Sequence, residues 1–361
     1  MIKMKTRLLD KGIGAIVLIN TSLNKLDPNI YYFLGKTFEY CVLIIKRDEK
    51  ILIVPKLEYG RAKEAIKGKK IMLKTITQRD FSEIIESLDI KGKIGINFEY
   101  ISLAEFNGLK KLKKSFIDIS EDLKILRMQK NVDEIKKIRT AARYADKIIA
   151  NLFERFRQKE SKPGKKGFKT EREVMEFLDS ETKRFGLKTS FKPIIASGKN
   201  SANPHHDSND ILHKGFCVID FGVKYKGYCS DMTRTIYLGR AAKKEIEDYE
   251  LVLKTNNSCI DFCRVDKKCS DIDRYCRKIL GDKEKYFIHG LGHGIGVEIH
   301  EGPTLNSRSK DILKSGCVIT IEPGIYYPGR YGIRIEDDLV LKNNSKEILT
   351  KTTKKLLCFY I

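Results

Sequence analysis

The first third of the chain alternates short hydrophobic runs with amphipathic stretches. The runs consist almost entirely of Ile, Val, Leu and other apolar residues, bounded by Gly, Asp or Lys. Runs of this length and composition are typical of strands that are buried on both faces. Strands are expected at residues 15–20, 40–45, 51–54 and 93–97, and helices at 57–66 and 81–88. The pattern predicts an α/β domain of about 120 residues.

A different pattern begins beyond residues 120–130. Asn131 and Glu134 have the spacing of a capping box, in which each side chain bonds the backbone N–H of the other residue. From Ile135 to Ile149 apolar residues recur every three or four positions, which indicates one buried face of a long helix. A surface loop is expected at 157–169 and an amphipathic helix at 171–185. After residue 190 the pattern changes to strands and glycine-rich turns.

Length and charge restrict the function classes. At 361 residues and 41% hydrophobic content, we expect two unequal domains, at 1–124 and 125–361. The net charge of +22 suggests a polyanionic partner. The lysines are spread along the chain, however, and the densest runs, 110–114 and 162–169, contain one aromatic residue between them. We therefore expect no nucleic-acid partner, because single-stranded nucleic acids bind to aromatic stacking surfaces.

The N-terminus and the cysteines favour a cytoplasmic protein. The basic start runs into Asp10 and Lys11 without an apolar segment, and no stretch has the length of a membrane span. The nine cysteines lack a disulfide-like spacing, so we expect reduced thiols. Four of them lie within 18 residues, at Cys259, Cys263, Cys269 and Cys276. A metal or redox role is conceivable there, but without a Cys-x-x-Cys motif we interpret them as small buried apolar side chains.

Acidic residues interrupt three segments that otherwise have the composition of core strands. They are Asp220 in 217–222, Glu322 in 318–324 and Glu336 in 333–341, and Asp231 follows Asp220 by eleven residues. An ionised carboxylate without a partner is costly to bury. Several such residues in one domain point to a shared positive charge.

Three of the six histidines lie in one glycine-rich passage, at His289, His293 and His300. Glycines at 290, 292, 294 and 296 argue against a helix there. Such a loop lets backbone and imidazole approach a ligand closely. Because the same domain contains several carboxylates within or near apolar segments, these histidines are expected to bind metal or to transfer protons.

Carboxylates with one imidazole suit divalent manganese, cobalt, iron or zinc, and several carboxylates can bridge two ions. The His-Glu-x-x-His zinc-protease motif is absent, as are a P-loop and a Gly-x-Ser-x-Gly elbow. The pattern therefore favours a two-metal centre.

With these motifs the chain resembles the pita-bread metallopeptidases, in their aminopeptidase P and prolidase branch. The matching stretches are 195–205, 219–222, 227–235, 289–303, 321–326 and 332–337, and weaker similarity extends to 126–145 and 29–35. The resemblance implies an α+β architecture, with a C-terminal pita-bread catalytic domain preceded by a smaller α/β creatinase-type domain.

The resemblance also implies a role for each matched residue. The metal ligands would be Asp220, Asp231, His293, Glu322 and Glu336. Asp231 and Glu336 would bridge two ions, His293 would bind one, and Glu322 would also be the general base. His205, His289 and His300 would position substrate and stabilise developing charge, and Arg334 would join the network from the same strand face as Glu336. His206 and His213 have no matched role, and we interpret them as surface residues.

The function implied is hydrolysis of the bond that precedes proline, with two divalent ions, manganese first among the candidates. Release of the first residue from longer Xaa-Pro peptides is the main hypothesis, because no element is found that would close the site to them. An Xaa-Pro dipeptidase is the alternative, and a non-catalytic binding protein on the same fold is a distant one. Intact ligand positions argue against the last, and against creatinase. The N-terminal domain disfavours methionine aminopeptidases. A homodimer is expected by family analogy.

Overall fold

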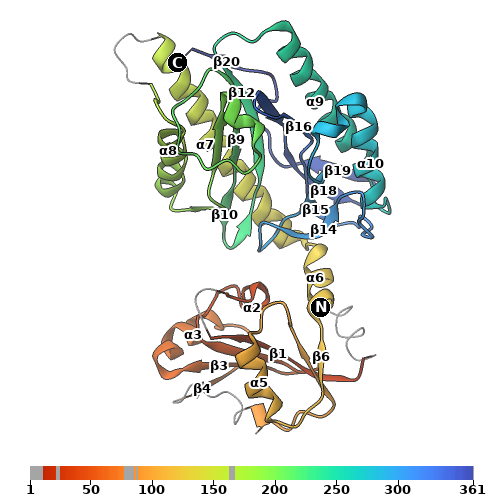
Figure 1. Cartoon of the computed structure of the whole chain (residues 1–361). Coiled ribbons are helices and arrows are strands. Elements are labelled where there is room, and N and C mark those ends of the chain that lie inside the picture. The colour runs from red at the N-terminus through yellow and green to blue at the C-terminus, as the bar shows by residue number, and fades with distance from the viewer. Residues whose placement is uncertain (1–10, 22–24, 77–84, 87, 162–166, 361) are drawn as a thin grey trace. The chain divides into compact units, whose positions relative to one another are not determined.

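The computed structural model of the chain describes residues 11–360, except 22–24, 77–84, 87 and 162–166. The chain divides into two compact units, Met1–Leu126 and Arg127–Ile361 (Figure 1). Among the described residues, no helix combines the length and hydrophobicity that a bilayer crossing requires.

The first unit is built on a six-stranded sheet with the strand order β4-β3-β2-β1-β5-β6. The pairs β1–β2 and β2–β3 are antiparallel and the other pairs are parallel. The strands are β1 Ile13–Asn20, β2 Cys41–Ile45, β3 Lys50–Pro55, β4 Met72–Ile76, β5 Lys93–Ile96 and β6 Phe116–Asp118. The helices are α2 Pro28–Leu34, η1 Lys56–Glu58, α3 Tyr59–Ala65, α5 Leu103–Lys110 and α6 Ser120–Met128, which runs into the second unit.

Two hydrophobic cores, one on each face, explain the continuous apolar runs of this sheet. On β1, Ile16 and Leu18 pack with α2 and α3, whereas Val17 and Ile19 belong to the core that includes Leu109 of α5. The expected strands are confirmed, and the expected helix at 57–66 is formed by η1 and α3. The expected helix at 81–88 lies largely outside the described residues.

The second unit contains two helix pairs and several small sheets. Its helices are α7 Val132–Ser161, α8 Glu171–Arg184, η2 Gly198–Ala202, α9 Lys243–Phe262, α10 Cys269–Leu280 and η3 Gly281–Tyr286. One sheet has the order β20-β12-β9-β8 and another β14-β13-β15-β18-β19. Their strands are β8 Ile194–Ser197, β9 Gly215–Phe221, β12 Met232–Leu238, β13 Gly292–Gly294, β14 Glu301–Leu305, β15 Val318–Ile321, β18 Asp337–Lys342, β19 Ser345–Ile348 and β20 Cys358–Phe359. A three-stranded sheet joins β7 Lys188–Thr189, β10 Val223–Tyr225 and β11 Tyr228–Cys229, and a hairpin joins β16 Gly324–Tyr327 to β17 Tyr331–Arg334.

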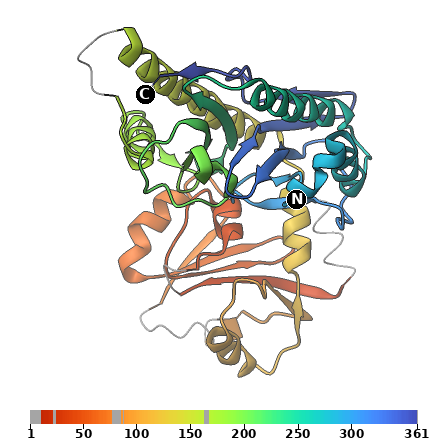
Figure 2. The same cartoon turned by 45° about the horizontal axis from the view of Figure 1, so that its top comes forward.

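Each helix pair covers its own group of strands. Helices α7 and α8 share a core with β8, β9 and β12, whereas α9 and α10 share a core with β15, β17 and β18. Two views place the two pairs on opposite sides of the strands (Figure 1, Figure 2). The four clustered cysteines are unpaired and buried in the α9–α10 core, as expected for small apolar side chains.

The capping box is confirmed at the start of α7. The Asn131 side chain accepts a bond from the Glu134 N–H, and the Glu134 side chain accepts one from the Asn131 N–H. The helix at 171–185 is confirmed as α8. The expected loop at 157–169 is wrong in its first part, because α7 continues to Ser161. The first helix-disrupting residues of this stretch are Pro163 and Gly164, so no residue before them ends the helix.

The third acidic segment, 333–341, is not one strand. It divides into β17 and β18, which belong to different sheets, and Ile335 and Glu336 lie between them. There the Ile335 N–H donates to Pro323 O at 3.3 Å and the Glu336 N–H donates to Thr233 O at 3.1 Å. These bonds replace the strand ladder, so Arg334 and Glu336 do not share a strand face as expected.

Candidate metal centre

Strand pairing brings the first two candidate ligands together. Asp220 is near the end of β9 and is paired with Thr233 of the antiparallel strand β12. Asp231 immediately precedes β12, so the β9–β12 pair carries both carboxylates at one end.

The glycine-rich passage brings His293 to the same place. His293 lies on β13, which pairs with β15, and the Glu322 N–H donates to Leu291 O at 2.9 Å just beyond β15. A Cβ on Gly292 would lie 2.2 Å from the backbone oxygen of Thr320, so only glycine allows this approach. As predicted, the passage is not a helix.

The candidate ligand atoms converge. Asp231, His293 and Glu336 each offer an atom within 4.8 Å of the others. His293 Nε2 lies 3.6 Å from Asp231 Oδ2 and 3.5 Å from Glu322 Oε1. His293 Nδ1 is 3.1 Å from Gly294 O, so it carries the proton of the neutral ring and leaves the Nε2 lone pair facing the carboxylates.

Two oxygens in this cluster show that the residues fit a cation. In the described part of the chain, Asp220 Oδ1 and Asp231 Oδ1 are buried and have no hydrogen-bond partner. Buried polar atoms normally have partners. Carboxylate oxygens with an imidazole nitrogen are the donors that divalent first-row metals bind, so these two oxygens are suited to hold such an ion.

The carboxylates raise one another's pKa. Burial, and then repulsion from Glu336 and Asp220, holds the pKa of Asp231 well above its usual range. Burial, and then Glu322 and Asp220, does the same to the pKa of Glu336. Burial raises the pKa of Glu322 to about 7. Cations would reverse this effect by favouring the ionised forms.

We expect the protein in a chelator to lose stability as the pH rises from about 6.5 to 8.5. The raised carboxyl pKa values mean that the folded state holds more protons than the unfolded state, so the free energy of unfolding falls as these groups ionise. Burial lowers the pKa of His293 to about 4, which has the opposite effect, but only below the ordinary histidine pKa. Melting temperatures across this range check the prediction. A flat profile in chelator, or an equal slope with manganese present, would contradict it.

Arg334 connects the carboxylates to His289. Its guanidinium donates to Asp220 Oδ2 at 2.6 Å, to Thr233 Oγ1 at 3.0 Å and to the Tyr326 hydroxyl at 3.0 Å. The Tyr326 hydroxyl is 2.9 Å from His289 Nε2, and His289 Nδ1 is 2.8 Å from Gly290 O. Burial, and then Arg334, lowers the pKa of His289 to about 3, so the neutral ring donates from Nδ1 and accepts from Tyr326.

Sequence reasoning assigned no role to two threonines and Tyr326. Thr233 Oγ1 donates to Glu336 Oε2 at 2.6 Å and Thr320 Oγ1 donates to Glu322 Oε1 at 3.2 Å. Thr233 follows Asp231 by two residues and Thr320 precedes Glu322 by two, so the two-residue period of a strand is a signal for both. Tyr326 lies in a matched motif, but only its contacts reveal its place.

The remaining predicted residues lie at the exposed side of the cluster. The rings of His300 and His293 are edge to face, with centroids 4.4 Å apart. His205 is exposed and is close enough for its charge to influence the pKa of Asp220 and of His289. No direct hydrogen bond joins His205 to the carboxylates among the described contacts.

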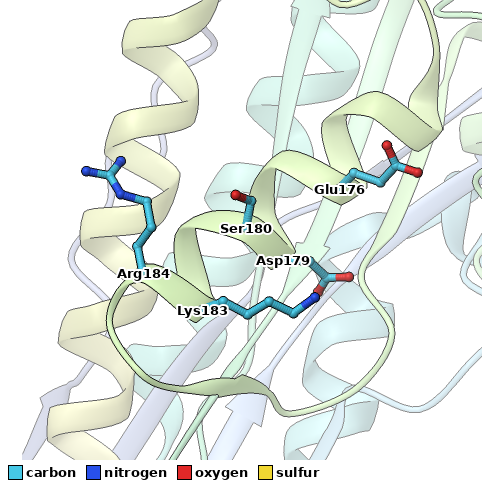
Figure 3. A pocket seen from close by; sticks show the side chains of 5 residues that line it. All are labelled: Glu176, Asp179, Ser180, Lys183 and Arg184. Carbon is cyan, nitrogen blue, oxygen red and sulfur yellow. The ribbon is translucent and has the colours of Figure 1, made fainter.

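A cavity of about 540 Å³ reaches this site at Tyr326. Its wall includes Asn203 and His206 from the segment after η2, Ile288, and Pro328 from the β16–β17 turn. A second hollow lies along α8, and its five lining residues all come from that helix (Figure 3). Of these two cavities in the described structure, the first has in its wall Tyr326, which accepts a bond from Arg334, so it is the one suited to a substrate.

Known proteins share both units of this chain. Residues 136–343 match metallopeptidase family M24, and residues 2–129 match the creatinase/prolidase N-terminal domain. A protein named Xaa-Pro dipeptidase from Pyrococcus furiosus is 37% identical over 91% of this chain and 92% of its own length.

Solved structures agree along the whole chain. An X-Pro aminopeptidase from Thermotoga maritima superposes with a TM-score of 0.86 at 29% identity, covering 99% of both chains. A prolidase from Pyrococcus furiosus superposes with a TM-score of 0.84 at 34% identity, covering 97% of this chain and 99% of its own. The expected fold, a creatinase-type domain followed by a pita-bread domain, is thereby confirmed, as is hydrolase chemistry with divalent metal. The chain belongs to metallopeptidase family M24, in its aminopeptidase P and prolidase branch.

Proposed function

We propose that this enzyme is an Xaa-Pro dipeptidase that uses two divalent ions, with manganese as the first candidate. The observation that carries the proposal is the convergence of Asp231, Glu322 and Glu336 on the free Nε2 of His293. Asp231 and the nearby Asp220 each add a buried oxygen without a hydrogen-bond partner in the described structure. Such a set has the donors to hold two cations, and Asp231 and Glu336 are the residues that would bridge them.

Bound ions of this kind lower the pKa of water and polarise the substrate carbonyl. Glu322 accepts the proton of the attacking water and delivers it to the leaving nitrogen, a role that suits a carboxyl whose pKa is raised by burial. Arg334 holds Asp220 in place through its 2.6 Å bond. His205 and His300, on the exposed side, are placed to stabilise the developing negative charge.

The dipeptide preference replaces our main hypothesis from the sequence. Release of a first residue from longer peptides was favoured because no closing element was found. The 37% identical relative, named Xaa-Pro dipeptidase, favours the dipeptidase alternative, although one similar structure is that of an X-Pro aminopeptidase. A bond to proline is a tertiary amide without an N–H, which general peptidases handle poorly, so a dedicated site is expected.

We expect kcat/KM for an Xaa-Pro dipeptide to exceed that for an Xaa-Pro-Yaa-Zaa tetrapeptide by about tenfold or more, which is 1.4 kcal/mol of transition-state binding. Product release in manganese-containing buffer measures this, and an Xaa-Ala dipeptide controls for the requirement for proline. Faster cleavage of the tetrapeptide would return the enzyme to the aminopeptidase class, and equal cleavage of Xaa-Ala would remove the proline specificity.

A further inference from the structure

The first residue of α8 carries a fully buried carboxylate that gathers one segment of chain. Glu171 Oε1 accepts the N–H and the hydroxyl of Ser197, both at 2.8 Å, and the amide of Asn200 at 3.2 Å. Its Oε2 lies 2.6 Å from His206 Nε2 and accepts the Asp210 N–H at 3.4 Å. A buried carboxylate is stable only with such partners, so these contacts fix the segment 197–210 to Glu171.

The segment between Asn200 and His206 is a pair of consecutive turns. The Asn203 N–H donates to Asn200 O at 2.9 Å, and the His206 N–H donates to Asn203 O at 3.2 Å. The Asn203 side chain accepts the His205 N–H at 3.2 Å. Glu171 therefore contacts both ends of this double turn, at the side chains of Asn200 and His206. His205 immediately precedes His206, so it lies next to the second contact.

The two adjacent histidines have different environments. The side chain of His206 is 16% exposed and its Nε2 meets the buried Glu171, which corrects our interpretation of His206 as a surface residue. His205 is exposed, and its neighbours Asn203 and His206 line the same cavity as Tyr326, which accepts a bond from Arg334. A carboxylate can only accept a hydrogen bond, so the His206 ring carries a proton on Nε2 and is the donor of the hydrogen bond to Glu171.

We propose that Glu171 and His206 are positioning residues that hold His205 at the carboxylate cluster. The inference rests on the proposed function: although His206 also lines the cavity suited to a substrate, Glu171 and His206 affect catalysis through the position of His205. Fixing the turn at both ends removes backbone freedom that His205 would otherwise lose in the transition state, and a misplacement of about 1 Å costs about a hundredfold in rate.

The test compares His206→Ala with His213→Ala. His213 is a matched control, because its Nε2 also meets a carboxylate, Asp210 Oδ2 at 3.1 Å, but it has no described side-chain contact with Glu171. We expect His206→Ala to lower kcat about 10- to 100-fold with KM changed less than about threefold. We expect His213→Ala to stay within about twofold, and His206→Gln, which keeps a donor, to recover most of the lost kcat.

A double-mutant cycle with His205→Ala decides whether His206 acts through His205. If it does, His206→Ala lowers kcat little further in the His205→Ala background. An equal loss in both backgrounds, or a loss confined to KM, overturns the proposal. If His206→Ala does not fold, His206→Gln and His206→Asn complete the same cycle. Any peptide that the wild-type enzyme cleaves can serve, so a wrong substrate assignment is detected in the wild type and does not affect the cycle.

Discussion

Replacing Asp231 by asparagine is expected to reduce kcat/KM by about a thousandfold or more, equivalent to several kcal/mol of lost transition-state stabilisation. Asp231 Oδ1 is buried without a hydrogen-bond partner in the described structure, and Oδ2 faces His293 Nε2 at 3.6 Å. Asparagine keeps the shape but removes the charge that would hold a cation. Kinetics and metal analysis on the same sample measure the effect.

The melting temperature distinguishes a loss of activity caused by loss of metal from one caused by unfolding. Asparagine removes a carboxyl group that is costly to ionise, since burial, and then repulsion from Glu336 and Asp220, holds its pKa well above the usual range. In chelator the variant should therefore melt at the wild-type temperature or above it. Asp248→Asn is the control, because Asp248 is also buried but is paired with Lys283 and Tyr331. We expect this control to melt lower and to retain its metal. Full activity in Asp231→Asn would contradict the role of Asp231 in a catalytic metal site.

Replacing Glu322 by glutamine is expected to lower kcat by about 10²- to 10⁴-fold, the range for a lost general base. Glu322 Oε1 lies 3.5 Å from His293 Nε2 and accepts the Thr320 hydroxyl at 3.2 Å, so the amide can occupy the same place. It cannot take a proton from water.

The pH dependence of kcat identifies the role of Glu322. Its pKa is about 7 without cations, and bound cations lower it, so the wild-type rate should fall on acidification below 7. The Glu322→Gln variant should lack this fall. If the variant keeps both its metal and more than a tenth of the wild-type rate, Glu322 is not the base.

The chemistry of the site could be predicted because it violates local rules. The carboxylates of Asp220, within an apolar run, and of Glu322, directly after the apolar run 318–321, stand out from the sequence alone. The glycines around His293 excluded a helix, and the structure has β13 there. Both signals depend only on neighbours along the chain.

The features that were wrong or missed depend on distant residues. The break between Arg334 and Glu336 is fixed by backbone bonds to Thr233 and Pro323, while the segment itself has the composition of one continuous strand. The inward orientation of His206 depends on Glu171, 35 residues earlier in the chain. No local pattern contains such information.

The requirement for two divalent ions is tested most directly by counting the metal ions bound while activity is measured. Protein stripped by a chelator should be inactive, and titration with manganese should restore hydrolysis of an Xaa-Pro dipeptide as the second of two equivalents binds. Calorimetry and elemental analysis on the wild type and Asp231→Asn would follow both events. Stripped protein that binds no divalent ion at this cluster, or that hydrolyses the peptide at the undiminished rate, would contradict the account.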